Sequence, residues 1–397
     1  MTGIKVFHLA TTLRGGAGIA ARRTHEALLE SGVESTLICL TANESLGKSI
    51  SIHRRSTYVR FLSKFNTLVQ SRLIQNSDRL VTPFSIESFV DSDLKQEDFD
   101  VLHIHSFYNL LSIKRISEIA KKFPSKKIFV TMHDQRFFTG GCHYSGECVN
   151  YSKDCASCPQ VRQIGEKFVK SSLQESIKAL STVENLRLIA PSNWLMEKSK
   201  ESTLASGLRT EVIGNPIPSC FFSVKSANSL QPKKIYFISA NLNNSLKGID
   251  VLIPALNYLK TDRPDLDFNV VFVGQGSVTG LDSRIDFKVT TASTDLEMAK
   301  LLKDADILVV PSLEDNLPST MLEALASNCT VIGSRVGGIT EVLDSANMQT
   351  FKVGDFLDLT RCITNSLLEV KAVSNSFIAE YSYENVAKKL VEAYSAD

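Results

Sequence analysis

Residues 306–341 read DILVVPSLEDNLPSTMLEALASNCTVIGSRVGGITE, the most informative stretch of the chain. The apolar run at residues 306–312 predicts a buried strand that ends in an acidic loop. A helix is expected to begin at Pro318, because proline is favoured at the first helical position. A second apolar run at residues 329–334 predicts the next strand. Strand, helix and strand in this order are typical of a parallel sheet with helical crossovers.

The same alternation extends in both directions from this stretch. In the first half of the chain, apolar runs that predict strands lie at residues 4–10, 35–40, 100–106, 126–133, 186–192 and 210–216. In the second half they lie at residues 233–240, 269–276, 306–312 and 329–334. Segments with helical periodicity lie between and after them, including residues 20–32, 247–260 and 383–394. The expected fold class is α/β, with doubly wound parallel sheets.

The length of the chain, 397 residues, predicts two domains, since a single domain has roughly 100–200 residues. Pro and Ser gather at residues 215–233, where the periodicity breaks, and this predicts the seam. We assign residues 1–215 and residues 216–380 to two Rossmann-like domains, and residues 381–397 to a final helix that packs back toward the first domain. The two domains are expected to face each other across a cleft at the carboxyl ends of their sheets, where open α/β sheets bind ligands.

The composition is that of an ordinary globular protein, with 43% hydrophobic residues, 22% charged residues and a net charge of +1, so it demands no nucleic-acid partner. Residues 1–200 carry 27 Lys and Arg against 19 Asp and Glu, a net +8, whereas residues 201–397 carry 17 against 24, a net −7. Residues 1–13 lack the pattern of an export signal, and no apolar run reaches the roughly 18 residues of a membrane span. We therefore expect a cytoplasmic protein.

The start of the helix at Pro318 predicts an anion site. The amides of Leu317, Ser319 and Thr320 lie where a helix N-terminus offers unpaired donors and a positive dipole end to a diphosphate. Glu323, further along the helix, would then reach a ribose. In the alternative interpretation, the acidic residues only cap a helix and line a solvated face.

Asp315 and Glu323 are separated by seven residues, within a string of strand, PSLEDNLP, helix and GGITE. This string resembles glycosyltransferase family 4, whose GT-B fold has two Rossmann-like domains. The resemblance implies that Glu323 binds the ribose hydroxyls of the donor nucleotide and that Asp315 contacts hydroxyls of the transferred sugar. The family usually has Glu at the position of Asp315, so the neighbouring Glu314 is a second candidate for the sugar contact. The donor-binding residues expected here are Glu314, Asp315, Asn316, Leu317, Ser319, Thr320 and Glu323.

Residues 239–252, SANLNNSLKGIDVL, resemble the family loop in which an Arg and a Lys grip the diphosphate. Lys247 matches the Lys, and Asn241 stands at the Arg position, with one extra residue between the two. A cation matters here because departure of the nucleoside diphosphate builds negative charge. Arg14 and Arg335 are alternative sources of the missing charge. Without the resemblance, Lys247 would be interpreted as surface charge.

The sequence RGGAGIAARR at residues 14–23 places Gly15, Gly16 and Gly18 between the first predicted strand and helix, where a ligand can approach the backbone closely. A plain tight turn is the alternative, but the position matches the family's glycine-rich loop, which faces the donor phosphate and the acceptor. His133 ends a later predicted strand, where the family has a histidine beside the donor sugar.

Cys142, Cys148, Cys155 and Cys158 form a C-x5-C-x6-C-x2-C pattern in a Cys-rich insert at residues 139–160. This spacing lets four thiolates surround one tetrahedral metal ion, for which zinc is the natural candidate. Four reduced thiols in a loop are the alternative. The insert also resembles that of a subgroup of the family associated with bacterial colanic-acid, exopolysaccharide and capsule pathways. We predict a structural zinc site that shapes the acceptor side and does no chemistry.

These features predict a retaining glycosyltransferase that moves a hexose-type sugar from a UDP- or GDP-linked donor to a saccharide or lipid-linked saccharide, in bacterial surface polysaccharide biosynthesis. The first domain is expected on the acceptor side and the second on the donor side. His133, Lys247 and Asp315 are the expected catalytic residues, and no catalytic metal is expected. No carboxylate pair stands out as the nucleophile and acid of a glycosidase. The resemblance implies that the leaving phosphate helps to deprotonate the acceptor, while the protein supplies positioning and electrostatics.

Residues 54–79 alternate basic and apolar side chains at near-helical spacing. Such a segment predicts peripheral docking on the anionic inner face of a membrane, where lipid-linked acceptors would lie. A solvated basic face fits the same pattern.

Two other functions stay open at this point. A nucleotide-sugar epimerase or a phosphorylase can use the same fold, because fold does not fix function. A non-enzymatic, zinc-bearing binding module would explain the cysteines, but the paired nucleotide-sugar motifs argue against it.

Overall fold

The chain folds into two compact units in the computed structural model, which describes residues 3–41, 49–53, 57–75, 80–89, 94–95, 98–222, 233–369 and 375–396. Unit 1 comprises Met1–Asn215 and Val386–Asp397, and unit 2 comprises Pro216–Asn385. Most of the predicted seam, residues 223–232, lies outside the described residues, as do residues 54–56 and 76–79 at the ends of the basic segment.

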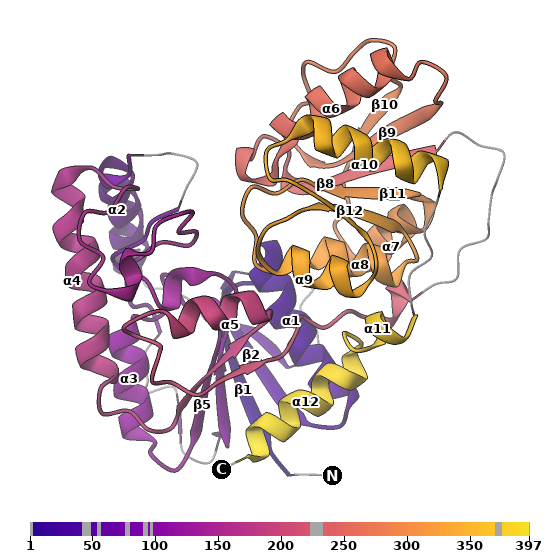
Figure 1. The fold of residues 1–397 in the computed structure, drawn as a ribbon. Helices are drawn as coiled ribbons and strands as arrows, with labels where there is room; N and C mark the ends of the chain where they lie inside the picture. Colours follow the sequence, from indigo (N-terminus) through magenta and orange to yellow (C-terminus); the bar gives the residue numbers. More distant parts are fainter. Residues whose placement is uncertain are drawn as a thin grey trace. The chain divides into compact units, whose positions relative to one another are not determined.

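Unit 1 is built on a seven-stranded parallel sheet with the order β3-β2-β1-β4-β5-β6-β7 (Figure 1). Its strands are β1 (Lys5–Thr12), β2 (Glu34–Thr41), β3 (Ile50–Ile52), β4 (Val101–Ile104), β5 (Lys127–Thr131), β6 (Leu186–Ala190) and β7 (Thr210–Val212). The inner strands are apolar runs because helices cover both faces of the sheet. Strand order reverses between β1 and β4, and in open α/β sheets ligands bind at the carboxyl ends of strands at such a switch point.

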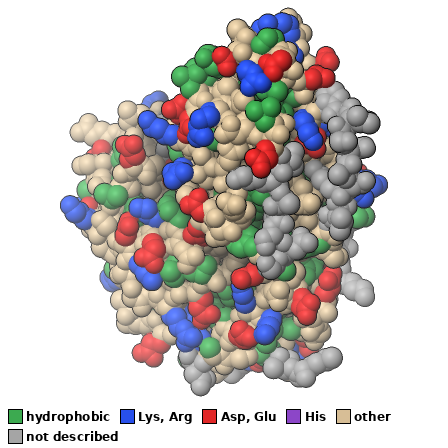
Figure 2. Space-filling view, turned by 45° about the vertical axis from the view of Figure 1, so that its right-hand side comes forward, with side chains coloured by type: hydrophobic (Ala, Val, Ile, Leu, Met, Phe, Trp, Pro, Cys, Tyr) green, Lys and Arg blue, Asp and Glu red, His purple; other side chains and the backbone are tan. Residues whose placement is uncertain are grey.

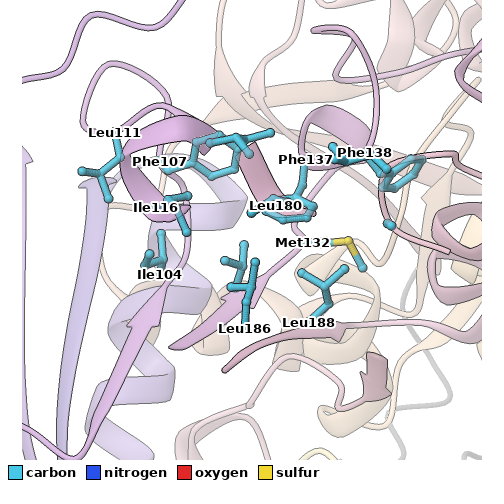
Figure 3. Packing of buried hydrophobic residues seen from close by; sticks show 14 of the residues in the cluster. Ile104, Phe107, Leu111, Ile116, Met132, Phe137, Phe138, Leu180, Leu186 and Leu188 are labelled. Atoms are coloured by element: carbon cyan, nitrogen blue, oxygen red, sulfur yellow. The ribbon is translucent and has the colours of Figure 1, made fainter. Parts of the chain in front are cut away.

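The helices of unit 1 surround this sheet. They are α1 (Gly15–Glu30), α2 (Thr57–Leu73), α3 (Ile113–Lys122), α4 (Gln163–Leu180) and α5 (Asn193–Lys200), with short 3-10 turns at Gln135–Phe137 and Asn150–Ser152. Apolar side chains from sheet and helices fill the space between them, among them Ile104 of β4, Ile116 of α3 and Leu188 of β6 (Figure 3). This core fixes the strand ends that carry the candidate site residues of unit 1.

The last helix, α12 (Tyr383–Ser395), returns the end of the chain to unit 1. The hydroxyl of Tyr394 lies 2.6 Å from Nδ1 of His103, a residue of β4. Lys127 Nζ donates to the carbonyls of Tyr394 and Ala396 at 3.0 and 2.8 Å, and Arg187 donates to Ala396 at 2.8 Å. Charged donors on β5 and β6 thus satisfy carbonyls that the helix end leaves unpaired.

Unit 2 has a six-stranded parallel sheet with the order β10-β9-β8-β11-β12-β13. Its strands are β8 (Lys233–Asn241), β9 (Phe268–Gln275), β10 (Phe287–Thr290), β11 (Ile307–Val310), β12 (Thr330–Ser334) and β13 (Gln349–Phe351). Its helices are α6 (Ile249–Asp262), α7 (Asp295–Asp304), α8 (Ser319–Ala326), α9 (Gly337–Ser345), α10 (Phe356–Leu368) and α11 (Asn375–Ala379), with 3-10 turns at Ser219–Phe221 and Ser245–Lys247. Separate apolar clusters pack on the two faces of the sheet, so this unit is also doubly wound.

Both units are therefore Rossmann-like α/β layers, which confirms the predicted fold class. On the face that Figure 2 shows, basic and acidic side chains are interspersed rather than separated. Among the helices of the described residues, none combines the length and the apolar character needed to cross a bilayer.

Candidate functional site

A pocket of unit 2 lies at the switch point of its sheet. Strand order reverses between β8 and β11, and both strands contribute residues to the pocket wall. The remaining lining comes from the Lys247 turn, the loop after β11 and the start of α8. The lining residues are Phe237, Ile238, Lys247, Val309, Val310, Pro311, Ser312, Asp315, Pro318 and Thr320. Three predicted site residues, Lys247, Asp315 and Thr320, are thus brought together in one concave site.

Lys247 and Asp315 form an ion pair in this pocket. Lys247 Nζ lies 2.6 Å from Asp315 Oδ2, and the same carboxylate oxygen accepts a hydrogen bond from the Ser312 hydroxyl at 3.2 Å. The Asp315 side chain is 10% exposed, so its charge depends on these partners. Ser312 is a site residue that the sequence analysis missed, although its place directly after an apolar strand was a usable signal.

Close backbone contacts set the position of both partners. Gly248 follows Lys247 with φ +78°, and a Cβ atom there would lie 1.8 Å from the Pro311 carbonyl oxygen. Gly337, at the start of α9, has φ +56°, and its Cβ would lie 1.7 Å from the Asp315 carbonyl oxygen. Only glycine fits these left-handed positions at such close approach. Gly248 of KGID and Gly337 of GGITE therefore allow the Lys247 turn and α9 to pack closely against the segment that follows β11.

The acidic loop and α8 hold the other predicted donor-binding residues. Glu314, Asn316, Leu317 and Glu323 are buried, and Ser319 and Thr320 are partly exposed. Helix α8 begins at Ser319 with Pro318 as its N-cap, one residue later than predicted, because the ψ of Pro318 is extended at 119°. The first-turn amides of such a helix lack partners inside the helix. An anion at the pocket side of Thr320 would meet that end of α8.

The structure does not supply a cation at the predicted arginine position. Asn241, at the end of β8, is exposed, and its side-chain oxygen accepts a hydrogen bond from the Asn243 amide at 3.0 Å. Arg335, a predicted alternative, donates to the Thr350 hydroxyl at 2.7 Å and does not line the pocket. Lys247 is thus the one cation among the residues that line this pocket.

The glycine-rich segment of unit 1 lies at the carboxyl end of β1. Helix α1 starts at Gly15, so these glycines form the first helical turn rather than the predicted loop. A Cβ on Gly15 or Gly16 would meet nothing within 4 Å, whereas a Cβ on Gly18 would lie 2.4 Å from the Thr12 carbonyl oxygen. Gly18 is therefore required for packing, and Gly15 and Gly16 leave open space beside the backbone.

His133 follows β5 and joins a row of buried imidazoles. Its Nε2 lies 3.2 Å from His105 Nδ1, and His105 Nε2 lies 3.1 Å from His8 Nδ1. Burial lowers the pKa of His133 to about 4, against a smaller opposing effect of Asp134, although part of the residue is accessible to solvent. Burial likewise lowers the pKa of His103 to about 3. At neutral pH these rings are uncharged, each able to donate one hydrogen bond and accept another.

The Cys-rich insert packs against the segment before β4 and against α4. Residues Val81 and Cys142 form an antiparallel bridge, and a Cβ on Gly141 would lie 2.7 Å from Pro83 N. A Cβ on Gly140 would lie 2.3 Å from the Val169 carbonyl oxygen of α4. The two glycines of TGGC are therefore spacers that let the insert approach unit 1 closely.

The four insert cysteines line one small pocket, together with Thr139, Ser145, Asn150 and Tyr151. All eight cysteines of the chain are described, and none of them forms a disulfide. A thiol hydrogen bond joins Cys142 and Cys158. Within the described residues, one group of three potential metal ligands has all its ligand atoms within 4.8 Å of one another, and it consists of His8, His103 and His105. No three of the four insert thiols are therefore as close together as this.

Comparison with solved structures identifies the fold of the whole chain. The two Rossmann-like units form a GT-B fold, which the chain shares over its whole length with solved glycosyltransferases. The crystal structure of HepE from Anabaena in complex with UDP-glucose has a TM-score of 0.61 and covers 99% of both chains, at 13% sequence identity. At this identity the likeness establishes the fold.

Sequence comparison gives a more specific match, and it covers unit 2. Residues 232–369 match the family described as Glycosyl transferases group 1. The D-inositol 3-phosphate glycosyltransferase of Pseudarthrobacter chlorophenolicus is 29% identical over 126 residues, which are 29% of this chain and 30% of the relative. A putative teichuronic acid biosynthesis glycosyltransferase of Bacillus subtilis is 29% identical over 140 residues, 35% of this chain and 34% of the relative. The chain thus spans about a third of the length of these curated relatives, and the matches support a glycosyltransferase of group 1.

Proposed function

We propose that this chain is a retaining glycosyltransferase that transfers a hexose-type sugar from a UDP- or GDP-linked donor to a saccharide or lipid-linked saccharide acceptor. A role in bacterial surface polysaccharide synthesis is part of the proposal. It is supported by the teichuronic acid relative and by the resemblance of the Cys-rich insert. The single observation that carries the activity is the pocket at the β8–β11 switch point, where a lysine and a carboxylate meet beside a helix N-terminus.

Each residue of the pocket has a distinct task in this proposal. Lys247 binds the diphosphate and neutralises the charge that develops on it as the glycosidic bond breaks. The start of α8 donates amides to the same phosphates. Glu323 accepts the ribose hydroxyls, and Asp315 accepts hydroxyls of the sugar, with Glu314 as the alternative contact. When a donor binds, Lys247 exchanges part of its contact with Asp315 for the phosphate, and Asp315 becomes available to the sugar.

Retention follows in the proposal from chemistry on one face of the sugar. The acceptor hydroxyl attacks from the side that the diphosphate leaves, and the departing phosphate oxygen takes the hydroxyl proton. His133, neutral because of its lowered pKa, positions the sugar by a hydrogen bond without adding a positive charge beside the oxocarbenium-like centre. Gly15 and Gly16 leave room for a ligand at the start of α1.

Binding of UDP and GDP to the Glu323→Gln variant tests the donor site. Loss of a charge-assisted hydrogen bond of about 1.5–3 kcal/mol predicts roughly 10- to 150-fold weaker binding by calorimetry. Asp344→Asn, an exposed change on α9, serves as the matched control and should bind like the wild type. Equal affinity of the two variants would refute the ribose assignment.

Product analysis separates the transferase from its main competitor. Incubation of the chain with UDP-glucose and GDP-mannose should release the free nucleoside diphosphate, by transfer or slow hydrolysis. An epimerase would instead return an isomeric nucleotide sugar with no free nucleotide, and this result would replace the proposal.

A structural zinc ion at Cys142, Cys148, Cys155 and Cys158 is a further part of the proposal. The donor set fits zinc chemically, since four thiols from one insert line one pocket, but the sulfurs would have to draw together to complete a tetrahedron. When bound, zinc would stabilise the fold of the insert. Elemental analysis should find about one zinc per chain and a loss of it in Cys155→Ser, in keeping with four-coordinate structural sites. Metal-free wild-type protein would contradict this part alone.

A further inference from the structure

Helix α2 of unit 1 has the reverse of the usual amphipathic arrangement. Among its described side chains, the buried ones are Ser63, Asn66, Gln70 and Leu73. The large apolar side chains that are exposed are Phe61, Phe65 and Leu68, which are 66%, 58% and 52% accessible. The spacing i, i+4, i+7 places these three on a single face of the helix. Water-exposed helices normally show the opposite distribution.

The orientation of α2 is fixed by backbone contacts with the start of α4. Ile74 and Val161 form an antiparallel bridge, and the Arg162 amide donates to the Leu73 carbonyl at 2.8 Å. A Cβ on Gly165 would lie 3.4 Å from Leu73 Cβ, so the two helices meet without a gap (Figure 1). Rotation of α2 to bury its apolar face would break these pairings.

The exposed face of α2 is also strongly basic. Arg60, Lys64 and Arg72 are exposed between the apolar side chains, and residues 57–73 contain no Asp or Glu. At the start of α4, Ile164 adds a side chain that is 64% accessible. Aromatic and aliphatic groups flanked by cations are the pattern of helices that lie in a lipid interface.

We propose that the outward face of α2 docks on an anionic lipid surface. Phe61, Phe65 and Leu68 would enter the boundary between headgroups and acyl chains, while the three cations meet lipid phosphates and carboxylates. A second copy of this chain is a poorer occupant, because a symmetric contact would oppose identical cation-rich faces. The inference concerns where the protein works and does not depend on the donor site.

Vesicle sedimentation of the full chain tests this surface. The wild type should sediment with vesicles of phosphatidylcholine and phosphatidylserine at low salt, and it should stay in solution with phosphatidylcholine alone. Phe61→Ser/Phe65→Ser should lower the partition coefficient at least about tenfold, because it removes two large apolar side chains from the interface. Arg60→Gln/Lys64→Gln/Arg72→Gln should lower it about 100-fold, at about fivefold per cation.

Leu296→Ser/Leu368→Ser, which removes two leucines of unit 2 that are each 63% accessible, is the matched control and should bind like the wild type. Release of free nucleotide from a soluble donor should be unchanged in the α2 variants, which shows that they are folded. A wild type that ignores anionic vesicles, or α2 variants that bind like the control, would overturn the inference. A dimer in solution that Phe61→Ser/Phe65→Ser separates would also overturn it and assign the face to a second copy.

Discussion

Lys247 has two partners in succession in the proposed reaction, and its substitution separates stability from catalysis. In the free chain it pairs with Asp315 at 2.6 Å, while 30% of its side chain remains accessible. Removal of the lysine leaves the Asp315 side chain, which is 10% exposed, without its ion-pair partner, and should cost about 1–3 kcal/mol of unfolding free energy. Loss of a donor that stabilises developing charge should in addition slow the reaction about 100-fold or more.

Lys247→Met should therefore melt several degrees below the wild type but remain folded at 25 °C, and transfer sugar at least about 100-fold more slowly. Lys303→Met, an exposed change on α7, is the control and should alter neither quantity. Thermal unfolding and donor turnover measured on the same samples provide the comparison. A turnover within a factor of two of the wild type would remove Lys247 from the mechanism.

Some residues that the sequence analysis named as site residues lie together in the structure, where a motif meets a strand end. Lys247, Asp315 and Thr320 were named from spacing and resemblance, and they line one pocket. Ser312 and the role of Gly248 were missed, because a side-chain hydrogen bond and a carbonyl contact across two loops leave no periodic signal. At Asn241 the resemblance to the family was misleading. The family has a cation at this position, whereas Asn241 is an exposed amide that bonds to the Asn243 backbone.

At the scale of elements, the Cys-rich insert packs closely against α4 because the contact residue is a glycine. Gly140 lies against the Val169 carbonyl of α4, where a Cβ would approach to 2.3 Å. Gly140→Ala should destabilise unit 1 by about 1–3 kcal/mol, the usual cost of overpacking. Fluorescence of Trp194, the single tryptophan of the chain and a residue of α5, reports this unfolding in urea.

Gly207→Ala is the control for this measurement, because a Cβ at Gly207 meets nothing within 4 Å. It should unfold within about 0.5 kcal/mol of the wild type, as surface substitutions usually do. If the two alanine variants have the same urea midpoint, the insert does not pack against α4 as described.

Most strands that the sequence predicted are inner strands of the two sheets, and the edge strand β7 is the exception. Every predicted strand is present, whereas β3, β10 and β13 were missed. These three are sheet-edge strands of three or four residues, and β10 has no buried residue. An edge strand has one neighbour and needs less apolar sequence, so composition reveals it poorly. Helix α8 starts one residue later than predicted and α1 five residues earlier, because caps follow backbone angles rather than composition.

At the scale of the molecule, the buried imidazoles make the stability of unit 1 depend on pH. Burial holds the pKa of His103 at about 3 and that of His133 at about 4, and it lowers the pKa of His8 and His105 as well. In the unfolded chain each would titrate near 6.5. Between pH 6.5 and about 4 the unfolded state therefore binds protons that the folded state does not bind. As the pH falls through this range, the free energy of unfolding decreases by about 1.4 kcal/mol per pH unit for each such histidine.

Urea unfolding followed by Trp194 should thus give a constant stability above about pH 7.5, where even the unfolded histidines are neutral, and a steep fall from pH 6 to pH 5. His103→Gln should make that fall shallower by about one proton, whatever its stability at pH 7.5. Gly207→Ala, which removes no titratable group, should keep the wild-type slope. Equal slopes for wild type and His103→Gln would show that His103 does not contribute to the pH dependence as described.

The return of α12 to unit 1 has a consequence for biosynthesis. During translation, residues 1–215 leave the ribosome long before Tyr394 is synthesised. The hydrogen bond between Tyr394 and His103 can therefore form only after all of unit 2 has been translated. A premature stop codon anywhere in unit 2 would therefore leave both units incomplete, the second cut short and the first without its final helix.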